Sequence, residues 1–127
     1  MELLQTGDKL IYVSLAEWIE DNILSGAYPE GAQIPSVADL SAAFRINHVT
    51  ALRGISILTD RGIIYKKRGI GMFVAEGAPH KIREQRAEEF YDKYVHTTVS
   101  EAKKLGISAD ELTDMIKRGY GNETDSK

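Results

Sequence analysis

The stretch PSVADLSAAFRINHVTALRGISILTDRG, residues 35–62, decides the fold. Ser36 opens a short helix, and Asp39 completes with it a capping pair that satisfies the first free backbone N–H groups, although glutamate is more usual than aspartate there. A tight turn around Arg45 follows, after which Asn47 is the N-cap of a longer helix. Two helices joined by so short a turn predict a helix-turn-helix, in which the second helix enters the major groove of DNA.

The longer helix has one side suited to a core and one side suited to a partner. Ala51, Ile55 and Leu58 recur at helical spacing and predict the buried side. Gly54 stands beside them at a cost of about 1 kcal/mol relative to alanine, which predicts a close approach to a neighbouring helix. The residues suited to base edges or thymine methyl groups are Asn47, His48, Val49 and Leu52, and those suited to phosphate oxygens are Thr50 and Arg53.

Some of these candidate contacts also have a simpler interpretation. Without a DNA contact, His48 is an ordinary surface histidine. Capping the helix is a simpler role for Asn47 than hydrogen bonding to a base. An exposed Leu52 contacts DNA, contacts a neighbouring side chain, or packs at the edge of the core, and the sequence alone leaves these alternatives open.

The flanking sequence completes a small mixed fold. Residues 11–25 carry apolar side chains at helical spacing and predict a first helix. Residues 63–67 and 72–75 are β-rich runs around a turn that contains Gly69 and Gly71, which predicts a hairpin. Three helices followed by a hairpin is the order of a winged helix-turn-helix, so the expected fold class is α+β and mainly α.

The net charge of −3 argues against a nucleic-acid partner, but the distribution of the charge argues for one. Residues 1–44 carry one basic and seven acidic groups, whereas residues 45–75 carry six basic groups and one acidic group. Basic groups beside a glycine turn suit phosphates or the minor groove. The candidates on the hairpin are Lys66, Lys67, Arg68 and Gly69, and Arg45 adds a cation between the two helices. A solvated basic face without a partner is the alternative.

Over residues 11–76 the chain resembles the GntR family of bacterial regulators, and in particular its short YtrA-like branch. The segments that carry the resemblance are Ile11-Tyr12 through Ser25-Gly26, Pro29-x-Gly31-x-x-Ile34-Pro35-Ser36-Val37, Asp39-Leu40-Ser41, Asn47-x-x-Thr50-Ala51, Leu58-x-x-x-Gly62-Ile63-Ile64 and Lys67-Arg68-Gly69-x-Gly71-x-Phe73-Val74. Their joint order and spacing make the resemblance specific. It implies that operator DNA is held by the second helix, the recognition helix and the wing.

The resemblance also assigns roles to single residues. The positions that match those associated with DNA contact or its support are Ser36, Thr50, Arg53 and Gly69. Ala38 and Leu52 stand where many family members have arginine, and each lost bidentate contact is typically worth ~1–3 kcal/mol. The operator or the affinity is therefore expected to differ from that of typical members. The family implies a repressor, often of a neighbouring transporter operon.

Two further helices are predicted after the hairpin, one over residues 80–105 and one from a Ser108 cap onward. Two helices cannot bury apolar faces this wide by themselves, so they need a partner surface. The residues of these faces are Phe90, Tyr94, Val95, Val99, Leu105, Leu112, Met115 and Ile116. A homodimer is therefore expected, and packing against the chain's own winged helix is the alternative. A two-fold dimer predicts a palindromic operator in double-stranded DNA.

These observations divide the chain into three expected regions. Residues 1–76 are the winged helix-turn-helix DNA-binding domain, residues 77–119 are a two-helix dimerisation segment, and residues 120–127 are a disordered tail. The two helices are too small to enclose a typical ligand pocket. Any small-molecule effector is therefore expected at the dimer interface.

The sequence argues against several other classes. The absence of cysteine excludes disulfides and thiolate metal sites, and no apolar run approaches the roughly 18 residues of a membrane span. Residues 1–9 lack a signal-peptide pattern, so a cytoplasmic location is expected. His80 and His96 lie too far apart on one expected helix to share a metal ion, and we expect no metal and no cofactor.

No catalytic constellation is convincing: the sequence shows no nucleophile–base spacing, no metal-ligand cluster and no phosphate loop. We therefore expect that the protein is not an enzyme. The alternative to a DNA-binding regulator is a winged helix that contacts other proteins and has no operator. A salt-dependent complex with DNA would distinguish the two, because phosphate contacts release counterions.

Overall fold

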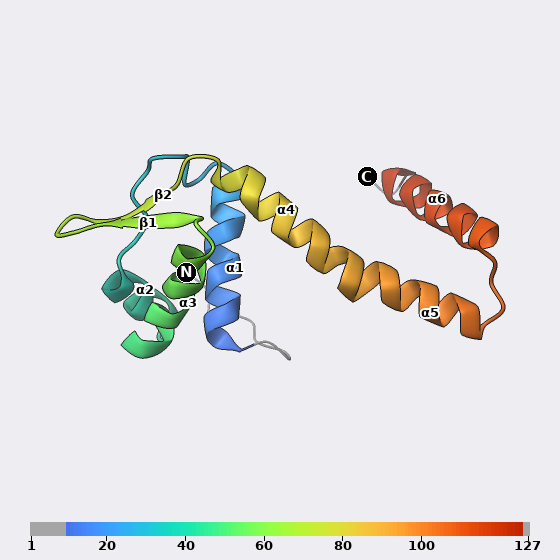
Figure 1. The fold of residues 1–127 in the computed structure, drawn as a ribbon, viewed down its shortest axis with the longest axis horizontal. Helices are drawn as coiled ribbons and strands as arrows, with labels where there is room; N and C mark the ends of the chain where they lie inside the picture. Colours follow the sequence, from blue (N-terminus) through green and yellow to red (C-terminus); the bar gives the residue numbers. More distant parts are fainter. Residues whose placement is uncertain (1–9, 126–127) are drawn as a thin grey trace. The chain divides into compact units, whose positions relative to one another are not determined.

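A computed structural model describes residues 10–125 of the chain, with side chains as far as Asn122. The elements are α1 (Ile11–Leu24), α2 (Val37–Phe44), α3 (His48–Asp60), β1 (Ile64–Lys67), β2 (Gly71–Val74), α4 (Ala78–Phe90), the π-helical turn η1 (Tyr91–Val95), α5 (His96–Lys104) and α6 (Ala109–Asp125) (Figure 1). The chain divides into two compact units after Gln85. The expectations for residues 1–9 and 126–127 lie outside the described residues.

The helix-turn-helix begins and ends where its capping residues predict. The Ser36 hydroxyl accepts a hydrogen bond from the Asp39 backbone N–H at 3.0 Å, and the Asp39 carboxylate accepts one from the Ser36 N–H at 3.2 Å. Arg45 closes α2 in the left-handed conformation, with a φ of 55°. The Asn47 side-chain oxygen then caps α3 by accepting the Thr50 N–H at 2.7 Å.

The first unit has a continuous hydrophobic core. Its buried members are Leu15, Ala16, Ile19, Ile23, Ile34, Leu40, Phe44, Ala51, Ile55, Leu58, Ile63, Ile64, Val74, Ala78 and Ile82. They come from α1, α2, α3, both strands, the start of α4 and two connecting segments, which contribute Ile34 and Ile63. Gly54 lies where α3 crosses α1, because a Cβ there would come within 3.0 Å of the Tyr12 carbonyl oxygen and of the Leu15 side chain. The expected close helix packing at this glycine is therefore present.

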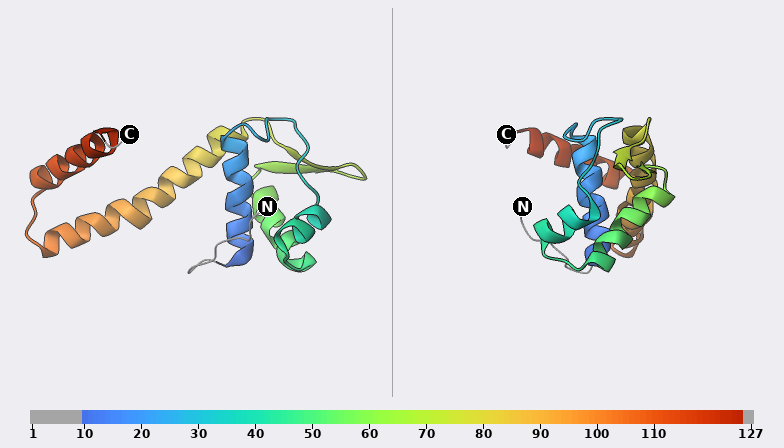
Figure 2. Two further views of the ribbon diagram at one scale, coloured as in Figure 1. Left: turned by 180° about the vertical axis from the view of Figure 1, so that it is seen from behind. Right: turned by 90° about the vertical axis from the view of Figure 1, so that its left-hand side faces the viewer.

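The hairpin is the wing of the fold, and we use that name for residues 64–74. Its strands are antiparallel, with Ile64 opposite Val74 and Tyr65 opposite Phe73. The segment at residues 31–34 runs along the other edge of β2, where Ile34 N–H donates to the Met72 carbonyl at 2.9 Å. The wing projects from the helices of the first unit (Figures 1 and 2). Three backbone segments, β1, β2 and residues 31–34, are therefore hydrogen-bonded side by side at the base of the wing.

The second unit is helical and differs in detail from the expected pair of helices. The single helix expected over residues 80–105 begins at Ala78 and is interrupted by the π turn η1. Gly106, with a φ of 71°, ends it as expected. Ser108 and Glu111 form the expected capping pair of α6, with hydrogen bonds of 3.0 and 3.1 Å. That helix continues to Asp125, beyond Gly119, where the sequence analysis placed its end.

Candidate nucleic-acid interface

The recognition helix α3 turns its apolar stripe inward and its candidate DNA contacts outward. Ala51, Ile55 and Leu58 are buried as predicted. Val49 and Leu52 are large apolar residues that remain 65% and 47% exposed. Since an exposed apolar side chain gains by meeting another surface, this side of α3 is suited to contact a partner.

One of the polar side chains at the start of α3 already hydrogen-bonds to the backbone. Because the Asn47 side-chain oxygen accepts the Thr50 N–H as the helix cap, the amide nitrogen of that side chain is the group better placed to donate to a base or a phosphate. His48 and Thr50 follow it in the first turn, and His48 is exposed. The free backbone N–H groups of this first turn also favour a nearby anion.

One arginine precedes α3 and another lies within it. Arg45 is exposed on the turn before it. The guanidinium of Arg53 lies 4.3 Å from the centre of the Tyr12 ring of α1, in cation–π geometry. This contact restricts the Arg53 side chain beside the outward face of α3. Tyr12 was expected only as part of the first helix, with no role beside Arg53.

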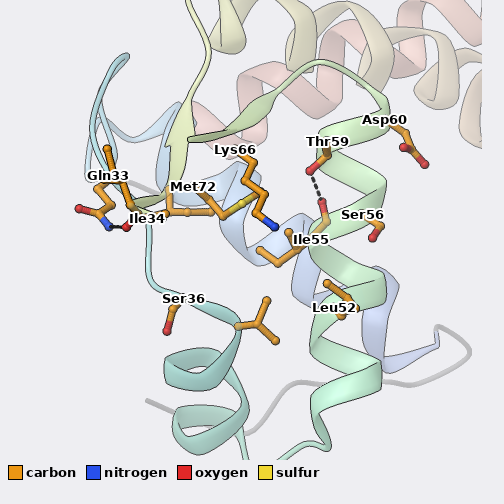
Figure 3. Close-up of a pocket in the computed structure, with 13 residues that line it drawn as sticks. Gln33, Ile34, Ser36, Leu52, Ile55, Ser56, Thr59, Asp60, Lys66 and Met72 are labelled. Atoms are coloured by element: carbon orange, nitrogen blue, oxygen red, sulfur yellow. Dashed lines mark hydrogen bonds between the residues drawn. The ribbon is translucent and has the colours of Figure 1, made fainter. Parts of the chain in front are cut away.

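The wing divides its cations between two faces. Lys67 lies over the Phe73 ring at 4.4 Å, and that ring stacks on Tyr65 with 5.9 Å between centroids. Lys66 is on the opposite face of the strand and points across a groove toward α3 (Figure 3). Arg68 is exposed at the turn between the strands. Positive charge is therefore available on both faces and at the tip of the wing.

A groove of about 410 Å³ separates the wing from α3 (Figure 3). Leu52, Ile55 and Met72 form part of its apolar walls, with Lys66 reaching in and Asp60 at one end. The candidates Ser36 and Leu52 both line this groove, so α2, α3 and the wing meet around it. Leu52 is therefore at the rim of a hollow and is not packed into the core.

Of the predicted contacts, Ser36, Leu52 and Lys66 line this groove. Lys67 lies over Phe73 on the other face of the wing, and Arg53 packs against Tyr12 of α1. Sequence reasoning missed Gln33, whose side-chain amide donates to the Ile70 carbonyl at 3.0 Å across 37 positions of the chain. It also missed Ile70 itself, at the wing tip. No local pattern marks either residue, because their relation depends on the tertiary fold.

Among residues 10–125 no group of three or more His, Cys, Asp or Glu side chains is placed to hold a metal ion. Within the same residues, none of the helices has both the length and the apolar character needed to cross a bilayer. The first unit presents an exposed side of α3, a basic wing and a groove between them.

Comparison with known proteins agrees with this geometry. The model of the family "Bacterial regulatory proteins, gntR family" matches residues 11–74, which is half of the chain. The helix-turn-helix-type transcriptional regulator YhcF of Bacillus subtilis (strain 168) is 28% identical over 109 residues, covering 86% of this chain and 88% of YhcF. The histidine utilization repressor of Klebsiella aerogenes is 37% identical over 65 residues, covering 51% of this chain and 27% of that repressor.

Among solved structures, a GntR-family protein from Bacteroides thetaiotaomicron is 36% identical and superposes with a TM-score of 0.79. The match covers 90% of this chain and 99% of that one, so it includes the helices after the wing. Together with the winged helix and its outward-facing basic elements, these matches establish the class of the protein. The chain belongs to the GntR family of bacterial regulatory proteins and is a DNA-binding transcription regulator of the winged helix-turn-helix type.

Proposed function

We propose that the protein is a homodimeric repressor that binds a palindromic operator. The observation that carries the proposal is the surface of the second unit. Ala102 is the only buried residue that the structure describes from Arg86 onward. Helices in water need an apolar face packed against something, and this unit provides no core of its own.

The second unit exposes a set of large apolar side chains, which we call the uncovered face. Its members are Phe90, Tyr91, Tyr94, Val99, Leu105, Met115, Ile116 and Tyr120. A groove of about 330 Å³ runs between the two helical segments, and the half-buried Val95 and Leu112 line it. All six of its other lining residues are uncharged, as expected at the centre of an interface.

A second copy of the chain is the partner that this face fits best. A two-fold arrangement lets one apolar surface cover an identical one, and two-fold dimers are the commonest soluble homo-oligomers. Phe90, Tyr94, Val95, Val99, Leu105, Leu112, Met115 and Ile116 are the proposed dimer contacts. Two recognition helices related by two-fold symmetry then require two half-sites, one helical turn or a small multiple apart.

The proposed division of labour follows the sequence analysis. Residues 1–76 bind DNA and residues 77–119 dimerise; any effector would bind where the two copies meet. Two helices after the wing and the resemblance quoted above favour the YtrA-like branch. Repression is supported by the similarity of 65 residues of this chain to a histidine utilization repressor, and the transporter operon rests on the family resemblance alone.

On the DNA side, the proposed contacts are divided by chemistry. Base edges and methyl groups are assigned to Asn47, His48, Val49 and Leu52, and phosphates to Ser36, Arg45, Thr50, Arg53, Lys66, Lys67, Arg68 and the backbone at Gly69. The exposed apolar pair on α3 suits thymine methyl groups in the major groove. An operator rich in thymine at the centre of each half-site is the expected consequence.

The test is selection of bound DNA from a random pool by the full chain at moderate salt, followed by affinity measurements at two salt concentrations. Enrichment of a palindrome whose affinity falls steeply with salt supports the proposal. Enrichment of a single half-site would overturn the dimer, and failure to retard any DNA at low salt would overturn operator binding. A promoter fusion that is active without the protein and silenced with it would support repression.

A matched pair of variants separates phosphate contact from a general effect of charge. Arg68→Ser removes a cation from the wing, and Lys103→Ser removes one from α5 in the second unit. Losing one phosphate contact lowers the slope of log affinity against log salt by about 1. We expect that change for Arg68→Ser and none for Lys103→Ser. Equal slopes for both variants would argue against DNA contact by the wing.

A further inference from the structure

The tip of the wing presents a single apolar side chain. Ile70 is 64% exposed, and it lies between Gly69 and Gly71, whose φ values are 76° and 148°. Because neither neighbour carries a Cβ, the Ile70 side chain is the one that projects between them. One edge of it borders the groove beside α3, and the rest faces outward.

The backbone at this tip is held in place. The Ile70 N–H donates to the Lys67 carbonyl at 2.9 Å, and the Ile70 carbonyl accepts from the Gln33 side-chain amide at 3.0 Å. Both backbone groups of Ile70 are therefore engaged. A Cβ on Gly71 would come within 2.4 Å of the Gln33 amide nitrogen, so glycine at position 71 keeps room for this hydrogen bond.

Basic residues of the wing lie near Ile70 in the sequence, on both faces of β1 and on the turn. Lys66 and Lys67 lie on opposite faces of β1, Arg68 is on the turn, and the Lys67 amine is held over the Phe73 ring at 4.4 Å. An apolar projection flanked by cations on both sides matches the minor groove, whose walls carry phosphates and whose floor is made of base edges. Proteins that contact this groove use the same combination of cations and apolar side chains.

We propose that Ile70 lies in the minor groove of the operator and selects A·T pairs there, with Gln33 as its positioning residue. This inference rests on the proposed operator binding. A G·C pair exposes the guanine N2 amino group in the minor groove, and an A·T pair exposes none. Covered by an isoleucine side chain, that amino group loses its water without gaining an acceptor, which is unfavourable. The isoleucine side chain therefore disfavours G·C pairs, because it leaves the guanine amino group without a hydrogen-bond acceptor.

The first experiment compares the DNA selected by the full-length wild type and by Ile70→Ala at the same salt. The wild type is expected to enrich A·T pairs at symmetric outer positions of the operator, and Ile70→Ala is expected to lose that enrichment while keeping the central sequence. Val49→Ala is the matched control, since it removes an exposed apolar side chain from α3. It should alter only central positions. Identical outer positions for wild type and Ile70→Ala would overturn the proposal.

The second experiment uses inosine, which pairs with cytosine but lacks the N2 amino group. At the outer positions, the wild type should bind I·C as well as A·T and bind G·C roughly tenfold less tightly, a typical effect of one wrong pair. Ile70→Ala should bind all three with similar affinity. If I·C binds as weakly as G·C, the amino group is not what the wing excludes, and the proposal fails.

Gln33→Met keeps the length of the side chain and removes its donor. It should weaken the discrimination against G·C at the outer positions and leave the unfolding midpoint and the central preference unchanged. A lower unfolding midpoint with full discrimination would show that Gln33 acts on stability alone. If the wild type selects no sequence at all, operator binding fails first, and this outcome is distinct from a wild type that selects an operator without an Ile70-dependent A·T preference.

Discussion

The two units of the chain are both built largely from amphipathic helices, but they use them in opposite ways. The first buries fifteen apolar residues in one core drawn from helices, strands and the loop before α2. The second, over its described side chains, buries only Ala102 and leaves aromatic and aliphatic residues on the uncovered face. The difference teaches that helix formation and core formation are separate requirements, and that the second unit needs another surface to complete it.

The same kind of helix cap occurs in both units, although the helices that follow it pack differently. Ser36 with Asp39 caps α2, and Ser108 with Glu111 caps α6 through the same reciprocal hydrogen bonds. Helix α2 then buries Leu40 and Phe44, whereas α6 buries none of the side chains that the structure describes for it. The caps determine where a helix starts, and tertiary contacts determine what its side chains meet.

The largest expected effect comes from placing a charge on the uncovered face. Ile116→Asp should weaken dimerisation by at least about 100-fold, because burying an unpaired carboxylate costs several kcal/mol. Sedimentation velocity over a range of concentrations measures this. Arg118→Asp is the control, since helical geometry places position 118 on the other side of α6 from Ile116. If both variants sediment as dimers, the uncovered face is not the interface.

The same glycine-to-alanine change should have opposite signs in the two units. Gly54→Ala should lower the free energy of unfolding by about 1–3 kcal/mol, because its methyl group would press on the Tyr12 carbonyl of a packed helix. Gly121→Ala meets nothing within 4 Å and should raise that free energy by up to about 1 kcal/mol through helix preference. Chemical denaturation measures both. A stabilising Gly54→Ala would mean that α1 and α3 are less tightly packed than the structure indicates.

A smaller effect is expected at the turn of the helix-turn-helix. Arg45 is the only residue other than glycine with a positive φ in the part of the chain that the structure describes. Arg45→Gly should raise the free energy of unfolding by about 0.5 kcal/mol, since relief of left-handed strain, about 1–2 kcal/mol, exceeds the added chain entropy of glycine, about 0.5–1 kcal/mol.

Arg45→Ala is the control for this prediction. It removes the charge and keeps the strain, so it should not gain stability. Both variants should lower the salt dependence of DNA binding by the same amount if Arg45 contacts a phosphate. A difference between them in salt dependence would mean that the conformation of the turn, and not the charge, determines binding.

The smallest expected effect is a pH dependence at the start of α6. The backbone N–H and the hydroxyl of Ser108 hold the pKa of Glu111 below its ordinary value. A carboxylate with a lowered pKa stabilises the folded state above its ordinary range, and this contribution is lost as the pH falls through the lowered pKa. The protection factor of the Ser108 amide, which is its NMR exchange rate relative to the intrinsic rate at each pH, should therefore fall as the solution is acidified. Glu111→Gln should abolish the pH dependence, and persistence of the dependence in that variant would assign it to another group.

Local signals in the sequence determined much of the fold. Ser36 and Asn47 marked the helix starts, Gly106 marked a helix end, and the periodic apolar residues marked the buried side of α3, because each depends only on neighbours within a few positions. The family pattern, which the matched model confirms over residues 11–74, added the winged helix and the DNA partner. Local reasoning was weakest for the end of α6, because a disordered tail was expected from residue 120 and the helix continues to Asp125.

Only the tertiary structure decided how these elements meet. The hydrogen bond from Gln33 to the wing tip, the stacking of Arg53 on Tyr12, and the groove between α3 and the wing join residues far apart in the sequence. Such contacts depend on chain topology and on the direction in which each side chain leaves the backbone. Neither can be predicted from the spacing of apolar residues along the sequence. For the same reason, the sequence revealed which face of the second unit is apolar, but the lack of a core beneath that face became visible only when the burial of every described side chain was known.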